Sequence, residues 1–589
     1  MSEGIVYTEF KGDWESLYVQ RYNRHIDELK WLYMELYSNE SMLSELCYQI
    51  HNFFIERDEG LKNRDVTREN NPDWYRKSKM TGMALYIDHF ADTIKGVEQS
   101  IEHLQKCNIN YVHFMPFFET TRYRTDDQYA ITDFRKTMEK IGKIEDLCHL
   151  TKLCHEKSIN VSVDFIMNRT SNEHEWAKKA MHGDVEYMNR YVTKTDHSYE
   201  WDLNYKNPRV LNEMMYNYMF IANLGTDLIQ INEIEDIWEG ESQNCSKVSQ
   251  IHTIARIMRI ISEIVCPGVL LLGNVKNDMK NAITYFGEDE KPEFHMIYQK
   301  TFMNEVWNSV ATRNVKLLQT KLDVINKYPK EYVFVNYLRN HEKLNWNLDY
   351  DFLYKNQKIN QKMHREYLNE YFLGRTGYSN SRGEVENNSD NSEKICFCGT
   401  TASMCGLEKA IDENNKKEIN QAIKLEIMLY AYLFIQSGIP VIYSGDEIGQ
   451  MNDYSYKENR DKMRDIQNVC RGKFDWSKAV KVVDEYSIEG KIMRGLNKIQ
   501  VVKNRENTFC QIADVRVVDT KNNSVICIAR EFAGEKILGI FNFSEHEKIV
   551  NIDEEEGIYE DLLSGKKMKV KCLQMQGYDF YYLKKIVVY

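Results

Sequence analysis

Short apolar runs alternate with amphipathic helical segments through the middle of the chain. Helical stretches, with an apolar residue every three or four positions, separate these runs. Parallel strands need crossovers of this kind, and eight of them close into a (β/α)8 TIM barrel. A doubly wound open sheet is the structural alternative, and the eightfold count favours the barrel. The runs are residues 83–88, 110–117, 159–167, 226–232, 268–274, 294–298, 331–340 and 438–446.

The two ends of the chain follow other patterns. Near the start, HIDELKWLYMEL and MLSELCYQIHNFFIER repeat apolar residues with a helical period, which predicts a helical N-terminal domain. Near the end, SVICIAREF, KILGIFNFS and YDFYYLKK have strand character and predict a small antiparallel β domain. We therefore expect three parts, at residues 1–82, 83–503 and 504–589.

Two polar segments interrupt the barrel pattern, one at about 168–200 and a longer one at about 347–420. The second contains SNSRGEVENNSDNSEK, which is too polar to bury and predicts a mobile surface loop.

Composition narrows the function. The net charge of −12 over 589 residues argues against a nucleic-acid surface and favours a small neutral ligand. No apolar run reaches about twenty residues, and the N-terminal sequence carries no signal-peptide pattern, so we expect a cytoplasmic protein with no membrane contact. Thirteen scattered cysteines suit reduced thiols. Cys396, Cys398 and Cys405 lack a fourth ligand at usable spacing, so no metal site and no cofactor are predicted.

The stretch GTDLIQINEIEDIW, from Gly225 to Trp238, holds the central question. Its strand ends at Gln230, Ile231 and Asn232, just before an acidic loop. In a (β/α)8 enzyme such strand ends carry the chemistry. Here they carry amides.

Several motifs occur in collinear order over nearly the whole chain, among them NNPDWYRKSKMTGMALYIDHF, YVHFMPF, EWDLNYKNPRV, VNYLRNH and IPVIYSGDEIGQMND. Together they resemble the motifs of amylosucrases, which are transglucosylases of the alpha-amylase family of glycoside hydrolases. The resemblance implies a barrel with insertions after its third and seventh strands and a C-terminal antiparallel β-sandwich. It also implies retaining chemistry, in which one carboxylate attacks the sugar and a carboxylic acid protonates the leaving oxygen.

Three catalytic positions implied by the resemblance are changed in this chain. Asn232 stands at the nucleophile and Asn274 at the general acid, while Glu342 replaces a stabilising Asp. Gln230 replaces the arginine that accompanies the nucleophile. Arg169 replaces a substrate-contacting His.

Other pocket positions match the family. Asp126 and Tyr129 match the pocket-floor Asp and stacking Tyr, and Arg471 matches the arginine that pairs with that Asp. His341 and Asp164 are also kept. Between residues 191 and 201 this chain lacks an insertion that walls the site in amylosucrases, so a more open and wetter pocket is expected.

Amides cannot replace the two carboxylates, because Asn232 is a poor nucleophile and Asn274 has no proton to give near neutral pH. Gln230 can instead hydrogen-bond Asn232. The residues therefore predict a pseudoenzyme of carbohydrate metabolism that binds a sugar or glucan, or serves as a scaffold for an unknown protein partner. The charges of Glu342 and Arg169 cancel, so the net charge of the substituted positions is near zero. The positive charge of Arg169 is also compatible with an anionic sugar phosphate.

The alternative is an active retaining glucosyltransferase or glycoside hydrolase that uses displaced carboxylates, among them Glu342, Glu233 and Glu235. Strand alternation predicts that Glu233 faces away from Asn232, and a bulge at Asn232 would reverse this. Glu235 and Asp236 are predicted as loop acids in solvent.

Overall fold

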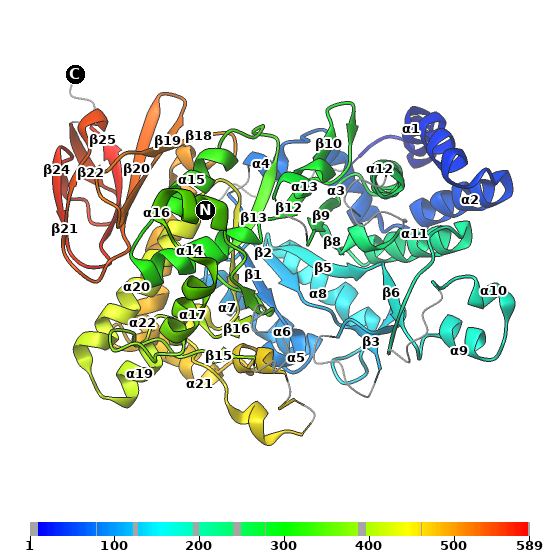
Figure 1. Cartoon of the computed structure of the whole chain (residues 1–589). Helices are drawn as coiled ribbons and strands as arrows, with labels where there is room; N and C mark the ends of the chain where they lie inside the picture. The colour runs from blue at the N-terminus through cyan, green and yellow to red at the C-terminus, as the bar shows by residue number, and fades with distance from the viewer. Residues whose placement is uncertain are drawn as a thin grey trace.

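Eight parallel strands form a closed barrel at the centre of the computed structural model (Figure 1). Neighbours around the barrel follow chain order, and the last strand pairs with the first. The predicted barrel is confirmed, and each predicted run supplies one strand. The strands are β1 (Gly82–Leu85), β2 (Tyr111–Phe114), β5 (Asn160–Ile166), β8 (Leu228–Asn232), β9 (Leu270–Asn274), β12 (Met296–Tyr298), β13 (Val333–Tyr337) and β17 (Ile439–Tyr443).

The structure describes most of the chain, and none of the helices in that part combines the length and apolar character that crossing a bilayer requires. The described residues are 10–77, 79–121, 128–192, 199–238, 249–276, 279–386, 396–460, 462–463, 465–555 and 557–586.

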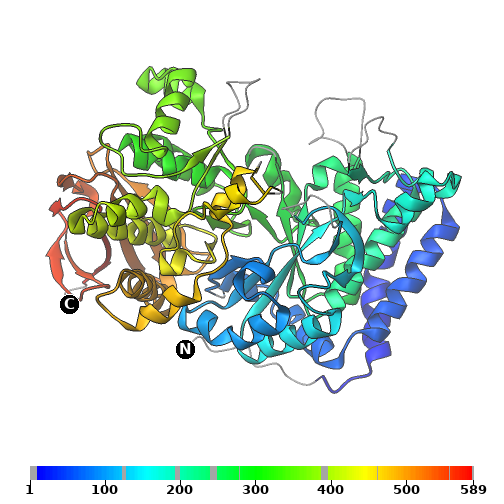
Figure 2. The ribbon, with the colours of Figure 1, turned by 90° about the horizontal axis from the view of Figure 1, so that it is seen from below.

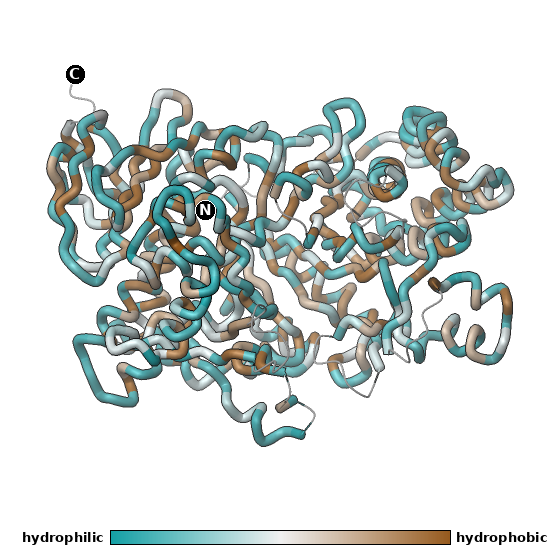
Figure 3. The backbone as a smooth tube through the Cα atoms, viewed as in Figure 1, coloured by the Kyte–Doolittle hydropathy of each residue, from teal (hydrophilic) through white to brown (hydrophobic). Residues whose placement is uncertain are grey.

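Helices cover the outside of the barrel, and local sequence fixes where they begin. Asn207 caps the helix before β8 by accepting a hydrogen bond from the Arg209 backbone, and Pro208 starts that helix without losing a needed donor. Figure 3 shows that the outer loops are largely hydrophilic. The helices are α5 (Ile87–Phe90), α6 (Ile94–Gln99), α7 (Ile101–Lys106), α8 (Ile144–Glu156), α11 (Pro208–Asn223), α12 (Ser249–Val265), α13 (Met279–Ala282), α14 (Thr301–Thr312), α15 (Lys316–Ile325), α20 (Lys416–Ile435), α21 (Trp476–Ala479) and α22 (Ile488–Arg505).

The N-terminal helices pack on α11 and α12, on the side of the barrel away from the C-terminal domain (Figures 1 and 2). Arg64 and Arg68 form ion pairs with Asp227, which is buried at the base of β8. These pairs fix the lower end of the strand whose upper end carries Gln230 and Asn232. The helices are α1 (Trp14–Tyr37), α2 (Glu40–Glu56), α3 (Glu59–Glu69) and α4 (Trp74–Lys77).

Two antiparallel pairs bring residues to the upper rim of the barrel. In the first insertion, Arg169 of β6 (Arg169–Ser171) lies opposite Asp202 of β7 (Glu200–Asp202). The second pair is formed by β3 (Phe118–Thr120) and β4 (Ile131–Thr137). Two short helices lie between β6 and β7, α9 (Glu175–Met181) and α10 (Val185–Met188), and a further small hairpin consists of β10 (Gly287–Glu288) and β11 (Lys291–Pro292).

The prediction of a mobile loop over residues 379–394 is wrong for its first half. Ser379 and Ser381 are 2% exposed, and their hydroxyls donate to the carbonyls of Tyr371 and Phe372. Free carbonyls at the end of a helix therefore bind side chains that composition alone assigned to solvent. Residues 387–395 lie outside the described part. Here the elements are β14 (Leu344–Asn345), α16 (Tyr350–Gln357), α17 (Gln361–Phe372), β15 (Glu384–Val385), β16 (Cys396–Cys398), α18 (Thr401–Met404) and α19 (Leu407–Asp412).

The C-terminal domain consists of a six-stranded antiparallel sheet and a two-stranded sheet, as the β prediction required. An apolar core lies between them, with Val525, Leu538 and Tyr559 from the large sheet and Val550 and Met575 from the small one. The large sheet contains β18 (Asp514–Val518), β19 (Val525–Phe532), β20 (Glu535–Asn542), β25 (Phe580–Lys585), β22 (Ile558–Asp561) and β23 (Lys567–Lys569), and the small one β21 (Lys548–Asn551) and β24 (Cys572–Met575).

Candidate functional site

A cavity of about 220 Å³ lies at the carboxyl ends of the barrel strands, where this fold places active sites. Pockets for drug-sized ligands span about 300–1,000 Å³. At about 220 Å³ the cavity is smaller than such pockets, and its volume suits one small ring. It is lined by Tyr129, Ile166, Asn168, Arg169, Glu200, Asn232, Glu233, Asn274, His341, Glu342, Gln467 and Arg471.

Asn232 and Asn274 end adjacent strands in the same register, so their side chains meet at the floor of the cavity. The Asn274 amide nitrogen donates to the Asn232 carbonyl oxygen at 2.7 Å, and the Gln230 amide nitrogen donates to the same oxygen at 2.8 Å. Both lone pairs of that oxygen are then used. The predicted hydrogen bond between Gln230 and Asn232 is confirmed.

Asp164 supplies the carboxylate of this network. Its Oδ1 accepts from the amide nitrogens of Asn232, at 2.5 Å, and Gln230, at 2.6 Å. Its Oδ2 lies 3.1 Å from Nε2 of His113, whose Nδ1 is 2.9 Å from the Ser162 hydroxyl. Because each amide nitrogen donates to at least one buried acceptor, Gln230 and Asn232 form a hydrogen-bonded set around Asp164 without an arginine.

Arg169 stands at the rim of the cavity between two carboxylates. Its guanidinium donates to Glu200 at 2.7 Å and also to Glu233. Burial alone would lower the pKa of this guanidinium, but the neighbouring charges of Glu233 and Glu200 raise it above its ordinary value. The predicted near-zero net charge counted only Glu342 and Arg169. It is incomplete, because Glu200 and Glu233 also line the cavity. A guanidinium that already pairs with two carboxylates attracts an anionic sugar phosphate less than an unpaired guanidinium would.

The prediction that Glu233 faces away from the cavity is wrong. Its backbone is left-handed, with φ 51° and ψ 43°, which breaks the alternation of the strand that ends at Asn232. The Glu233 carboxylate accepts from Asn168 at 3.3 Å and lies 3.0 Å from the Lys276 ammonium. It lines the same cavity as Asn232.

The prediction of solvent exposure is also wrong for Glu235 but holds for Asp236. Glu235 is only 4% exposed, accepts a hydrogen bond from the Lys276 backbone, and is absent from the cavity wall. Burial raises the pKa of its carboxyl above the ordinary value. Asp236 is exposed and pairs with the Lys276 ammonium at 2.9 Å. Glu235 is thus unavailable to a bound sugar.

The remaining predicted residues lie on the other side of the cavity. The Tyr129 hydroxyl is 3.0 Å from Nε2 of His341, and Glu342 follows in the same loop after β13. Arg471 donates from Nε to the His341 carbonyl at 2.9 Å and from its terminal nitrogen to Gln467 at 2.5 Å. Asp126, the predicted partner of Arg471, lies outside the described residues.

Sequence reasoning missed Glu200, Gln467 and His113. Glu200 reaches the cavity through the register of β7 against β6, which no local pattern reveals. Gln467 lies four residues before Arg471, a spacing that a search around that arginine could have used. His113 faces the interior from β2 and resembles an ordinary core position in sequence.

The arrangement can bind hydroxyl groups from several directions. Amides, a phenol, an imidazole and guanidinium groups supply donors and acceptors around one small space. At the floor, the groups nearest the strand ends are amides, which neither attack carbon nor deliver a proton at neutral pH.

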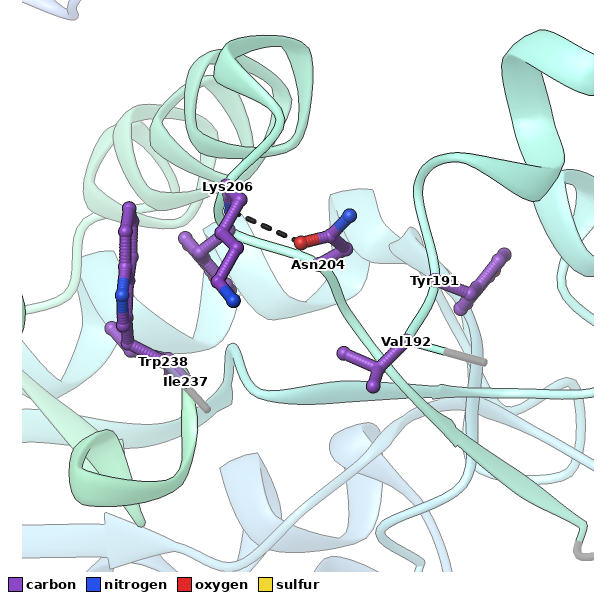
Figure 4. A pocket seen from close by; sticks show the side chains of 7 residues that line it. Tyr191, Val192, Asn204, Lys206, Ile237 and Trp238 are labelled. Carbon is purple, nitrogen blue, oxygen red and sulfur yellow. Dashed lines mark hydrogen bonds between the residues drawn. The ribbon is translucent and has the colours of Figure 1, made fainter. Parts of the chain in front are cut away.

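A second, shallower hollow of about 200 Å³ lies between the β6–β7 insertion and the segment after β8. Figure 4 shows Trp238 and Lys206 on one side of it and Tyr191 and Val192 on the other. The Asn204 side chain between them accepts from the Lys206 backbone at 3.2 Å.

Comparison with known proteins agrees with this architecture. Residues 71–200 match the alpha amylase catalytic domain, and residues 516–576 match the bacterial alpha amylase C-terminal domain. Both matches are to models of alpha-amylase domains, and together they cover less than half of the chain. The first match runs from the end of the N-terminal helices to β7 of the rim, and the second lies within the C-terminal sheets.

Curated proteins from several bacteria show what the chain is similar to. A glucosylglycerate phosphorylase of Spirochaeta thermophila is 27% identical, over 39% of this chain and 43% of that protein. A glucosylglycerate phosphorylase of Escherichia coli is 22% identical, over 77% of this chain and 82% of its own length. A trehalose synthase/amylase of Mycolicibacterium smegmatis is 21% identical, over 68% and 67%.

Solved structures with low sequence identity have the same fold. The trehalulose synthase of Pseudomonas mesoacidophila superposes with a TM-score of 0.61 at 15% identity, covering 87% of this chain and 99% of that protein. The isomaltulose synthase of Klebsiella sp. gives 0.61 at 14% identity with the same coverage.

Proposed function

We propose that this protein is a non-catalytic member of the alpha-amylase family that binds a single neutral sugar ring, such as a glucosyl unit, in the barrel cavity. The observation that carries the proposal is the closed hydrogen-bond set of Asn232, Asn274 and Gln230 around Asp164. Amylosucrase-like descent is the finer form of this proposal, and it rests on the sequence motifs alone.

The amides support a loss of chemistry. A retaining enzyme needs a carboxylate that attacks and a second that protonates the leaving oxygen. Losing one catalytic group typically lowers the rate on the order of a thousandfold to a millionfold. The rate losses of groups that act as a unit do not add, because removing one of them already disables the others. Two amides at these positions therefore leave no useful turnover.

The rest of the cavity supports a retained sugar site. Tyr129, His341 and Arg471 form a connected polar wall opposite the amides. Relatives are named for glucosylglycerate, trehalose and isomaltulose, and structures of trehalulose synthase variants hold glucose and isomaltulose. A glucosyl ring is the part that suits the volume here.

Calorimetric titration with glucose, maltose, sucrose and trehalose tests the proposal. We expect at least one of them to bind with one site per chain. We expect His341→Ala to weaken binding at least about tenfold, a loss of about 1.4 kcal/mol, because the imidazole borders the ring site. His149→Ala, on the exposed face of α8, is the matched control and should leave binding unchanged. The binding role fails if none of the sugars gives heat, or if both variants bind like the wild type.

A second candidate function is retaining chemistry by Glu233 and Glu342, since both line the cavity. Asn168, Arg169 and the Lys276 ammonium hold the Glu233 carboxylate at the rim, which is unlike a nucleophile free to meet the sugar. This candidate requires that the wild-type protein turns over one of the same sugars and that Glu233→Gln abolishes the turnover.

A further inference from the structure

A second group of chemically reactive side chains lies outside the barrel cavity, between the helical shell and the segment after β17. His103 is on α7, Cys107 follows that helix, and Glu447 lies in the turn η4 (Asp446–Ile448). Their exposures are 8%, 1% and 1%. One possible ligand atom of each lies within 4.8 Å of the other two.

One imidazole nitrogen faces both partners. Nε2 of His103 is 2.9 Å from Oε1 of Glu447 and 3.6 Å from Sγ of Cys107. A ring nitrogen carries either one hydrogen or one lone pair, so it cannot satisfy both groups well through hydrogen bonds. A cation placed among the three atoms would satisfy all of them.

Two of the three ligand separations lie close to those around a tetrahedral zinc ion. Zinc bonds are about 2.3 Å long to thiolate sulfur and about 2.0 Å long to imidazole nitrogen, which places the two ligand atoms about 3.5 Å apart at the tetrahedral angle. Cys107 Sγ lies 3.6 Å from His103 Nε2, close to that value. Nitrogen and oxygen ligands would lie about 3.3 Å apart. Glu447 would therefore retreat by about 0.4 Å.

A fourth soft atom adjoins the group. Sδ of Met493, on α22, is 3.8 Å from Cys107 Sγ. Two sulfur ligands on one tetrahedral ion, each about 2.3 Å from it, would lie about 3.8 Å apart. Thioether and thiolate ligands suit soft or borderline metals.

We propose that His103, Cys107 and Glu447 bind one Zn²⁺ ion, with Met493 at the fourth position. On binding, the Cys107 thiol releases its proton to solvent. The thiolate and the Glu447 carboxylate then balance the charge of the ion, and the buried site is neutral overall. Phe90, Phe474 and Trp476 pack around His103 and limit access of water.

The ion would have a structural role. It would join α7, α22 and the turn after β17, which come from distant parts of the sequence. It lies outside the sugar cavity, since none of its ligands lines that cavity. Its test is therefore independent of the proposed sugar binding.

Cobalt substitution of the metal-stripped full-length protein tests the proposal. We expect one Co²⁺ per chain, a thiolate-to-cobalt charge-transfer band in the near ultraviolet, and loss of that band when Zn²⁺ is added. Cys107→Ser should remove the band and weaken Zn²⁺ binding on the order of a hundredfold or more. Cys154→Ser, which changes a fully buried cysteine on α8, should keep both.

Loss of the band in Cys107→Ser would also follow from misfolding. Circular dichroism checks the fold of that variant, and Glu447→Gln provides a second variant. Glu447→Gln keeps the thiol and should retain the charge-transfer band while weakening zinc binding. If Cys107→Ser does not fold, the wild-type cobalt spectrum and this variant still decide the matter. No band in the wild-type protein, or a band that Cys107→Ser leaves intact in folded protein, would overturn the proposal.

Discussion

Asn232→Asp is expected to lower the free energy of unfolding by about 3 kcal/mol at neutral pH, because the new carboxylate would face Asp164 inside the barrel. The Asn232 amide nitrogen now donates to Asp164 at 2.5 Å. An aspartate there replaces a donor by a second negative charge at contact distance, and both groups are buried. Chemical denaturation of the two proteins measures the difference.

The loss of stability in Asn232→Asp, relative to the wild type, should depend on pH. Repulsion raises the pKa of the introduced carboxyl in the folded state, so the folded protein holds a proton that the unfolded chain releases. Stability of the variant should then fall, relative to the wild type, as the pH rises from about 4 to 7.

Two further variants separate this cause from a general effect of substitution. Gln230→Arg combined with Asn232→Asp should regain most of the loss, because a guanidinium beside Asp164 balances the added charge. Asn420→Asp makes the same chemical change on the exposed surface of α20 and should alter stability by less than about 0.5 kcal/mol. A change for Asn232→Asp as small as that of the surface control would contradict the described network.

The triple variant Gln230→Arg, Asn232→Asp, Asn274→Glu is expected to turn over an activated aryl α-glucoside at least about a thousandfold faster than the wild type. It restores an attacking carboxylate, the cation beside it and a carboxylic acid at the neighbouring strand end. Asn232 and Asn274 are paired in register, so the restored groups face one cavity. Release of the aryl alcohol, followed by absorbance, measures the rate.

The same three positions offer a matched control. Gln230→Arg with Asn232→Asp and Asn274→Gln restores the charge pair but keeps an amide at the acid position. It should gain far less with a sugar leaving group, which needs protonation, than with an aryl group, which leaves readily. A triple variant no faster than the wild type would show that these three positions do not limit turnover.

The barrel was predictable because each strand is a short apolar run between helical stretches. Burial of both faces imposes that pattern on β5 and β9 alike. The predicted runs overshoot the strands, as at Glu331–Asn340 against Val333–Tyr337. Beyond the end of this strand the chain continues into a turn in which Leu338 and Arg339 are also buried. The C-terminal strands β19, β20 and β25 were predictable from the same apolar character.

The amides of the site were predictable, but the rim was not. Residue identity alone placed Asn232 at a strand end and suggested its bond to Gln230. The turn of Glu233 into the cavity depends on one left-handed residue, and the ion pair of Arg169 with Glu200 depends on strand register across a long insertion. Neither leaves a periodic trace in the sequence.

The His103, Cys107 and Glu447 group shows the same limit more strongly. His103 and Glu447 are 344 positions apart, and only closure of the barrel brings them together. Close spacing in the sequence instead singles out Cys396, Cys398 and Cys405 as possible metal ligands. Topology decides contacts of this kind.

If the proposed function is right, the barrel site of the wild-type protein cannot form a covalent bond to a sugar. Incubation with a fluorinated glucosyl fluoride, followed by intact-protein mass spectrometry, tests this, because such a reagent traps the glucosyl-enzyme intermediate of a retaining mechanism. We expect an unchanged mass for the wild type and one added fluoroglucosyl group for the triple variant. A labelled wild-type protein whose label maps to Glu233 or Glu342 would refute the proposed function.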